Sequence, residues 1–176
     1  YLVSRDVDLL SDLARHSAAA VMLSVTSLDV KLQRSLEPRA ATAARRLGAV
    51  RVLAEAGIPV GVNVAPIIPG LTDHEIPSIL EAAADAGASF AGMIVLRLPH
   101  GVKTMFAGWL RQHVPDRADK VLNRVRELGD GALYDVRFGA RGRGVGPWAE
   151  QLRAMFRVKA QRMGLGPSPS LSTASF

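Results

Sequence analysis

Polar side chains interrupt three apolar runs of the sequence, and their types suit a ligand with hydroxyl groups and a carboxylate. Ser24, Thr26 and Asp29 end the first run, Asn63 lies inside the second, and Arg97 follows the third. Hydroxyl and amide groups exchange hydrogen bonds with a sugar, and a guanidinium holds a carboxylate in a fork. An amide among valines needs a buried partner. We therefore expect Asn63, more than the others, to contact the ligand.

Several candidate residues also have a purely structural interpretation. Core hydroxyls bonded to the backbone would explain Ser24 and Thr26 equally well, and Asp29 suits a turn or a helix cap. Arg39 either touches a ligand or pairs with Glu37 across a loop. The sequence leaves these alternatives open.

Alternating strand and helix signals would position the polar residues. Apolar runs predict strands buried on both faces of a parallel sheet at 19–25, 60–67 and 92–96. Periodicity and caps predict helices at 6–15, 41–56, 72–86, 102–114, 116–127 and 147–163. Residues 27–40 read as a polar bend. Thr72 and Glu75 match a capping box, so we expect Glu75 mainly to cap a helix.

The spacing of the strands, roughly 30 to 40 residues, is that of a (βα) barrel. The three units predict an α/β fold, a partial barrel; an open doubly wound sheet is the alternative. In both folds ligands bind at the carboxyl ends of the strands. We expect residues 1–136 to form the barrel portion, 137–165 a basic loop and helix, and 166–176 a disordered tail. The first residue is not Met, so we expect the chain to begin inside a longer protein.

Three motifs follow one another in a specific order: Glu37-Pro38-Arg39, Ala65-Pro66-Ile67-Ile68-Pro69-Gly70 and Leu96-Arg97-Leu98-Pro99. Together they resemble an uncharacterised branch of radical S-adenosylmethionine (SAM) proteins. That branch is related to spore photoproduct lyase and is often labelled DNA repair photolyase. The resemblance covers nearly the whole chain, from about Tyr1 to Leu165.

The resemblance implies a SAM site and the (βα) barrel of the radical SAM type, here its C-terminal portion. Ser24 to Asp29 looks like the end of the fourth barrel strand, which faces SAM. Pro66 to Asp73 resembles the G-x-I-x-G-x-x-E element that packs its backbone against adenine. Pro66 stands for the first glycine and Asp73 for the acid. The expected SAM contacts are Ser24, Thr26, Asp29, Arg39, Asn63, Ile68, Gly70 and Arg97.

In that family a [4Fe–4S] cluster, held by a C-x-x-x-C-x-x-C motif and reduced by an electron donor, cleaves SAM to a 5′-deoxyadenosyl radical. This chain has no cysteine, so we expect the motif to lie upstream and the chain alone to be inactive. The resemblance leaves the substrate open, with a nucleic-acid base as one candidate. The four histidines lack metal-ligand spacing, so we expect no metal site within the chain.

The net charge of +6 arises from one segment. Residues 137–162 hold seven basic side chains and one acidic one, whereas the charges before Arg137 balance. The competing hypothesis is therefore a nucleic-acid-binding or interaction module without catalysis; a solvated helix face is the simpler explanation. The expected contacts are Arg137, Arg141, Arg143, Arg153 and Arg157. No apolar run approaches the roughly 20 residues of a membrane span, and we expect a cytoplasmic location.

Overall fold

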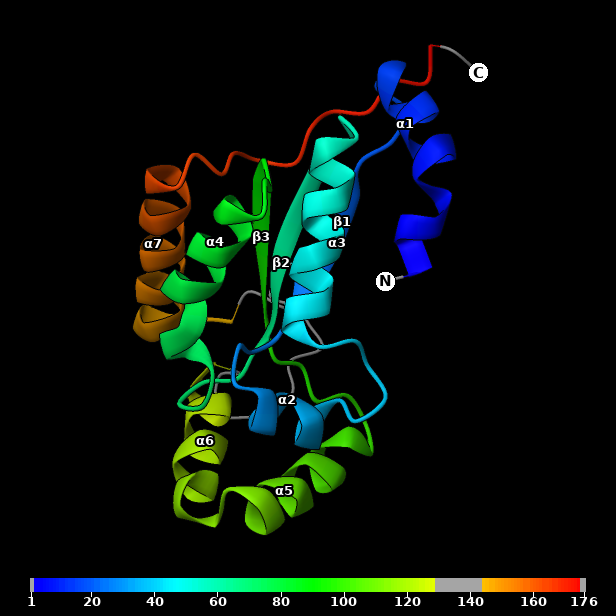
Figure 1. Ribbon diagram of the computed structural model, residues 1–176. Coiled ribbons are helices and arrows are strands. Elements are labelled where there is room, and N and C mark those ends of the chain that lie inside the picture. Colours follow the sequence, from blue (N-terminus) through cyan, green and yellow to red (C-terminus); the bar gives the residue numbers. More distant parts are fainter. Residues whose placement is uncertain (1, 129–143, 175–176) are drawn as a thin grey trace.

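The computed structural model describes residues 2–128 and 144–174. Three parallel strands, β1 (Val21–Val25), β2 (Val60–Ile67) and β3 (Phe90–Val95), form one sheet in the order β1-β2-β3 (Figure 1). The helices are η1 (Leu2–Asp6), α1 (Val7–Arg15), α2 (Val30–Leu36), α3 (Ala43–Glu55), η2 (Asp73–Glu75), α4 (Ile76–Asp85), α5 (Val102–His113), α6 (Pro115–Leu128) and α7 (Gly146–Arg162). The parallel sheet and its helices confirm the α/β class; the barrel stays a prediction.

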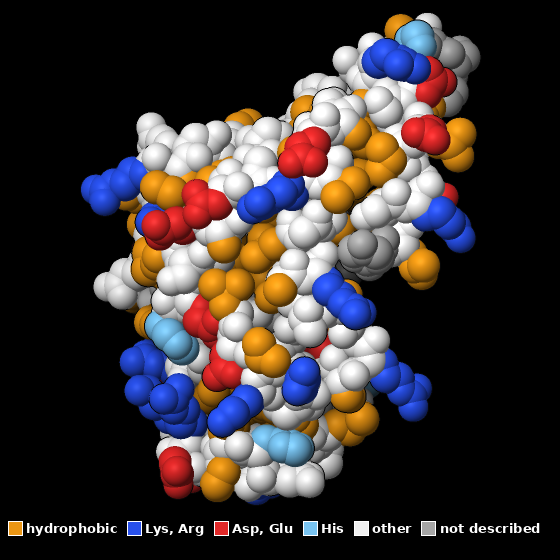
Figure 2. All heavy atoms as spheres, in the orientation of Figure 1, with side chains coloured by type: hydrophobic (Ala, Val, Ile, Leu, Met, Phe, Trp, Pro, Cys, Tyr) orange, Lys and Arg blue, Asp and Glu red, His pale blue; other side chains and the backbone are white. Residues whose placement is uncertain are grey.

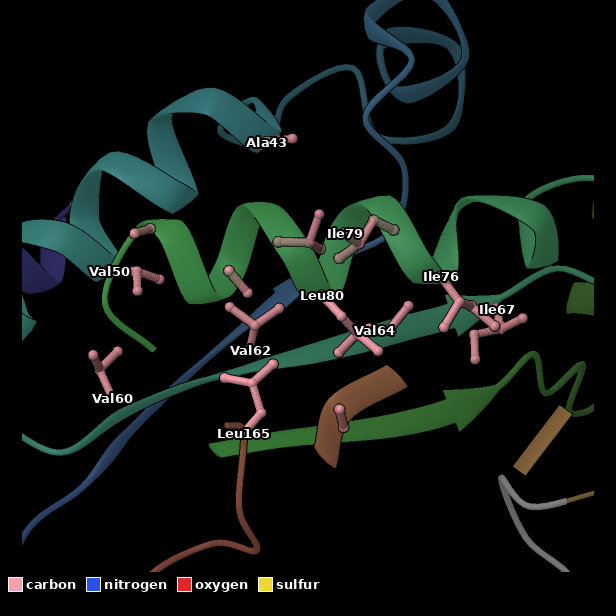
Figure 3. Packing of buried hydrophobic residues seen from close by; sticks show 14 of the residues in the cluster. Ala43, Val50, Val60, Val62, Val64, Ile67, Ile76, Ile79, Leu80 and Leu165 are labelled. Atoms are coloured by element: carbon pink, nitrogen blue, oxygen red, sulfur yellow. The ribbon is translucent and has the colours of Figure 1, made fainter. Parts of the chain in front are cut away.

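One face of the sheet carries the main core. Alternate residues of β2, Val60, Val62 and Val64, point toward α4 and are at most 1% exposed (Figure 3). Ile79 and Leu80 of α4 meet them and are fully buried. Burying a Val, Leu or Ile side chain stabilises a fold by about 1.5–3 kcal/mol. This alternating row therefore fixes which face of β2 turns toward the helices.

The opposite face of the sheet is partly open. Met22 of β1 and Ile94 of β3 are 45% and 43% exposed, and Ser24 is exposed as well. The prediction that all three strands are buried on both faces is therefore wrong for β1 and β3. Both are outer strands of the sheet. Their apolar runs combine core residues such as Val25 and Val95 with open-face residues such as Met22 and Ile94.

Two local predictions were wrong. The expected polar bend at 27–40 contains α2, which Asp29 caps by accepting hydrogen bonds from the backbone N–H groups of Lys31 (2.8 Å) and Leu32 (3.1 Å). The Thr72–Glu75 capping box does not form. Thr72 Oγ1 instead accepts from Ile68 N–H at 2.9 Å, and α4 begins only at Ile76, after the short helix η2.

A second cluster lies at the carboxyl ends of β2 and β3. Ile68 and Leu98, which follow these strands, pack with buried residues of α5 and α6. Figure 1 shows the two helices as a hairpin at this end of the sheet. Trp109 of α5 ties the hairpin to α2, because its Nε1–H donates to Ser35 O at 3.0 Å. The α5–α6 hairpin thus borders the end of the sheet where a ligand was expected.

The segment after α7 returns along the amino ends of the strands (Figure 1). Gly166 N–H donates to Ser89 O at 3.0 Å, and Ser172 N–H donates to Ser17 O at 2.9 Å. The expected disorder of residues 166–176 and the expected domain boundaries at 136 and 165 stay predictions.

Candidate functional site

A row of three aligned residues crosses the open face of the sheet. Ser24 of β1 is in register with Asn63 of β2, and Asn63 with Gly92 of β3. A Cβ atom at position 92 would lie 3.2 Å from Asn63 Oδ1 and 3.5 Å from the methyl group of Met22. Glycine at this position therefore leaves room for the amide and places Met22, Asn63 and Gly92 on one face.

The Asn63 amide has no protein partner within residues 2–128 and 144–174. The side chain is half-buried, yet it makes no hydrogen bond to another described side chain or backbone group. An unpaired amide removed from water costs free energy. Asn63 is therefore free to bond a ligand on the open face, next to the exposed Ser24.

Thr26, two residues beyond Ser24 in the chain, belongs to a polar network at the end of β1. Its side chain is 3% exposed, and its Oγ1 lies 3.0 Å from Ala65 O and 3.2 Å from Glu37 Oε1 as a hydrogen-bond donor. Glu37 Oε2 accepts from Arg46 Nη2 at 2.6 Å. Thr26 is thus a core hydroxyl bonded to the backbone, as its structural interpretation predicted. Glu37 pairs with Arg46 of α3, where the sequence had suggested Arg39.

A second carboxylate holds the next two residues of the chain. Glu75 Oε1 accepts from Ser27 Oγ–H and Glu75 Oε2 from Leu28 N–H, both at 2.7 Å. Glu75 is thus a long-range clamp between η2 and the loop after β1, and the capping role expected for it is wrong. The three-residue spacing between Thr72 and Glu75 favoured a local hydrogen bond. Nothing in the sequence indicated the contact with Ser27, which is 48 residues away.

The remaining predicted residues are dispersed. Arg39 is exposed and, with Ser24, lines an open pocket of about 610 Å³ beside β1. Arg97 is exposed just beyond β3.

Ile68 is 1% exposed in the second cluster. Gly70 has a φ of +76° and faces Val121 of α6. The structure therefore brings Ser24, Thr26 and Asn63 together and places Ile68 and Gly70 against the α5–α6 hairpin.

Metal ligation has little support from the side chains. In the parts of the chain that the structure describes, no three His, Asp or Glu residues gather closely enough to hold a metal ion. The whole sequence lacks cysteine, so these residues do not fit an iron–sulfur cluster. None of the helices within 2–128 and 144–174 is long and apolar enough to cross a membrane.

The basic residues expected to meet nucleic acid are divided. Arg137, Arg141 and Arg143 lie outside the described residues. On α7, Arg153 Nη1 donates to Gly144 O at 3.2 Å, whereas Arg157 is exposed. Figure 2 shows further Lys and Arg side chains gathered near the α6 end of the molecule. Those of α6 are Arg117, Lys120, Arg124 and Arg126.

Comparison with known proteins gives the family context. Residues 2–83 match the family model described as "Radical SAM superfamily". This match supports the assignment of the chain to the radical SAM superfamily. Uncharacterized protein Rv2578c of Mycobacterium tuberculosis (strain ATCC 25618 / H37Rv) is 30% identical over 129 residues, which are 72% of this chain and 37% of that protein. Uncharacterized protein ORF301 of Acidianus two-tailed virus is 40% identical over 91 residues, 49% of this chain and 30% of that protein.

The chain thus spans only about 37% of the length of the mycobacterial relative. No solved structure matches the chain. The radical SAM match agrees with the expected superfamily and with SAM as the cofactor that it implies. The relatives are uncharacterized, so the spore photoproduct lyase branch stays a prediction.

Proposed function

We propose that this chain forms part of the SAM-binding wall of a longer radical SAM enzyme that cleaves SAM reductively. The unpaired Asn63 amide carries this proposal, because it sits beside the Ser24 hydroxyl on the open face of a parallel sheet. Ligands of such sheets bind near the carboxyl ends of the strands. The family match over residues 2–83 supports SAM as the ligand.

The proposed roles follow from exposure and hydrogen bonding. Ser24 and Asn63 bond the hydroxyls of the ribose, and the exposed guanidinium groups of Arg39 and Arg97 are the candidates for the SAM carboxylate. Thr26 and Asp29 hold the loop that follows β1, because their hydrogen bonds go to the protein. Ile68 and Gly70 contribute only the shape of the turn that backs the adenine.

The cluster that the superfamily implies needs ligands from outside these 176 residues, since the chain has no thiolate. The electron donor is a separate partner of the longer enzyme. Three finer proposals rest on the resemblance of the motifs: the branch related to spore photoproduct lyase, a nucleic-acid base as substrate, and a cytoplasmic location.

Replacing Asn63 tests the SAM site. In the cluster-reconstituted protein that contains this chain, Asn63→Ala should weaken SAM binding, because one buried hydrogen bond is worth about 1–3 kcal/mol, or roughly 5- to 150-fold in Kd. Calorimetric titration with SAM measures this change. Asn123→Ala is the matched control, since Asn123 is exposed on α6 and its one hydrogen bond among the described residues is to Arg126. Equal affinities of the two variants would remove Asn63 from the site.

A nucleic-acid-binding module without catalysis is the second candidate, favoured by the exposed Arg157 and by the basic side chains of α6. Such binding depends on phosphate contacts and loses about one unit of salt slope with each contact removed. Arg157→Gln should therefore reduce the salt dependence of binding to a duplex oligonucleotide. An unchanged slope would exclude α7 from that surface.

A further inference from the structure

Arg46 of α3 joins three parts of the fold through a single side chain. Its Nη1 donates to Ser24 O at 2.8 Å, its Nε to Ala41 O at 2.9 Å, and its Nη2 to Glu37 Oε2 at 2.6 Å. The Arg46 and Glu37 side chains are 14% and 28% exposed. A planar guanidinium can serve three acceptors in fixed directions, which a lysine cannot do. The arrangement therefore fixes positions as well as balancing charge.

Glu37 extends this fixation to Thr26. One carboxylate oxygen accepts a hydrogen bond from Arg46 Nη2–H, and the other lies 3.2 Å from Thr26 Oγ1. Arg46 consequently holds the chain at Ser24 directly and at Thr26 through Glu37. Between these two contacts lies Val25, which is 1% exposed, so the end of β1 is held by packing and by the polar network together.

The held strand lies at one edge of the sheet. β1 is an outer strand and pairs only with β2 among the described strands. The Ser24 carbonyl bonds Arg46, while the Ser24 side chain lies in the row with Asn63 and Gly92. A shift of this one peptide would move the Ser24 hydroxyl relative to the Asn63 amide.

We propose that Arg46, together with Glu37, is a positioning residue that sets the Ser24 hydroxyl beside the Asn63 amide for SAM. This inference rests on the function proposed above for Ser24 and Asn63. Arg46 itself makes no contact with the ligand. It acts through the Ser24 peptide, so its effect on SAM affinity depends on the Ser24 hydroxyl being present.

A double-mutant cycle between Arg46 and Ser24 tests this dependence. In the cluster-reconstituted protein, Arg46→Met should weaken SAM binding about 10-fold, the size expected for a lost hydrogen bond of a charged group. Arg46→Lys should recover only part of the affinity. In a Ser24→Ala background, Arg46→Met should cost no more than about twofold, because contacting residues are coupled. Arg51→Met is the matched control: Arg51 is exposed on the same helix and should leave affinity unchanged.

The outcomes separate this inference from the proposed function. If Asn63→Ala weakens SAM binding but Arg46→Met behaves like Arg51→Met, the inference is overturned and the SAM site stands. An equal loss in both Ser24 backgrounds also overturns it. A purely structural Arg46 would lower the Tm and leave the Kd of the folded protein unchanged. If Arg46→Met fails to fold, Arg46→Lys and Glu37→Gln carry the same cycle. If neither Asn63→Ala nor Ser24→Ala changes the affinity, the proposed function and this inference both fail.

Discussion

Removing the Glu75 carboxylate should destabilise the chain far more than removing an exposed carboxylate. Glu75 accepts hydrogen bonds from Ser27 Oγ–H and Leu28 N–H, each at 2.7 Å, and the Ser27 side chain is fully buried. Hydrogen bonds to charged groups contribute about 1.5–3 kcal/mol each, and water reaches the half-buried Glu75 and replaces part of this. We therefore expect Glu75→Ala to lower the free energy of unfolding by about 2–4 kcal/mol.

Urea denaturation of the 176-residue chain, followed by circular dichroism, measures the change. Glu55→Ala is the control, because Glu55 is exposed at the end of α3 and an exposed substitution changes stability by less than about 0.5 kcal/mol. Glu75→Gln adds a second comparison. A capping box works with either Glu or Gln at this position, so Glu75→Gln would leave it intact. In the clamp, the same substitution removes the negative charge and one of the two accepting oxygens. If Glu75→Ala matches Glu55→Ala, or if Glu75→Gln is neutral, the clamp is refuted.

Three further substitutions test the packing and the electrostatics. Gly61→Ala should destabilise the chain by about 1–3 kcal/mol, because its Cβ would meet the Phe90 ring and lie 2.6 Å from Phe90 O. Gly48→Ala, whose Cβ would have no atom within 4 Å, should stabilise α3 by about 0.5–1 kcal/mol in the same urea denaturation experiment. Arg15 hydrogen-bonds Asp12 Oδ1 at 2.7 Å and lowers the pKa of Asp12, so Arg15→Met should raise that pKa in an NMR titration. The stabilisation from a lowered pKa is present above the unfolded-state pKa and is lost as pH falls through the folded-state value. A destabilising Gly48→Ala or an unmoved Asp12 titration would contradict these assignments.

Periodic apolar patterns predicted the secondary structure well where packing and pattern agree. The sequence placed β2 at 60–67, which are its bounds in the structure. The pattern could not say which strands are buried on both faces, because β1 and β3 show long apolar runs although one face of each is partly open. Apolar side chains on an open face look the same in sequence as those in a core.

The site was harder to predict, since its contacts join residues far apart in the chain. Asn63 stood out as a polar residue among valines, and the structure leaves its amide without a partner among the described residues. Arg46 gave no comparable signal, because an arginine in an amphipathic helix is expected to face solvent. Its contact with Ser24 spans 22 residues and depends on how α3 crosses the edge of β1. No spacing rule contains that information.

The different surroundings of the two faces of β2 explain how a strand of valines accommodates an asparagine. Val60, Val62 and Val64 turn toward the helices, while Gly61, Asn63 and Ala65 alternate with them on the other face. An amide without a partner in a closed core would cost several kcal/mol, about 2–7 by transfer measurements, so its presence indicates that water or a ligand completes its bonding. Met22 and Ile94 add apolar surface on either side of the amide. A polar centre between apolar flanks suits a ligand that combines a flat ring with a hydroxylated sugar.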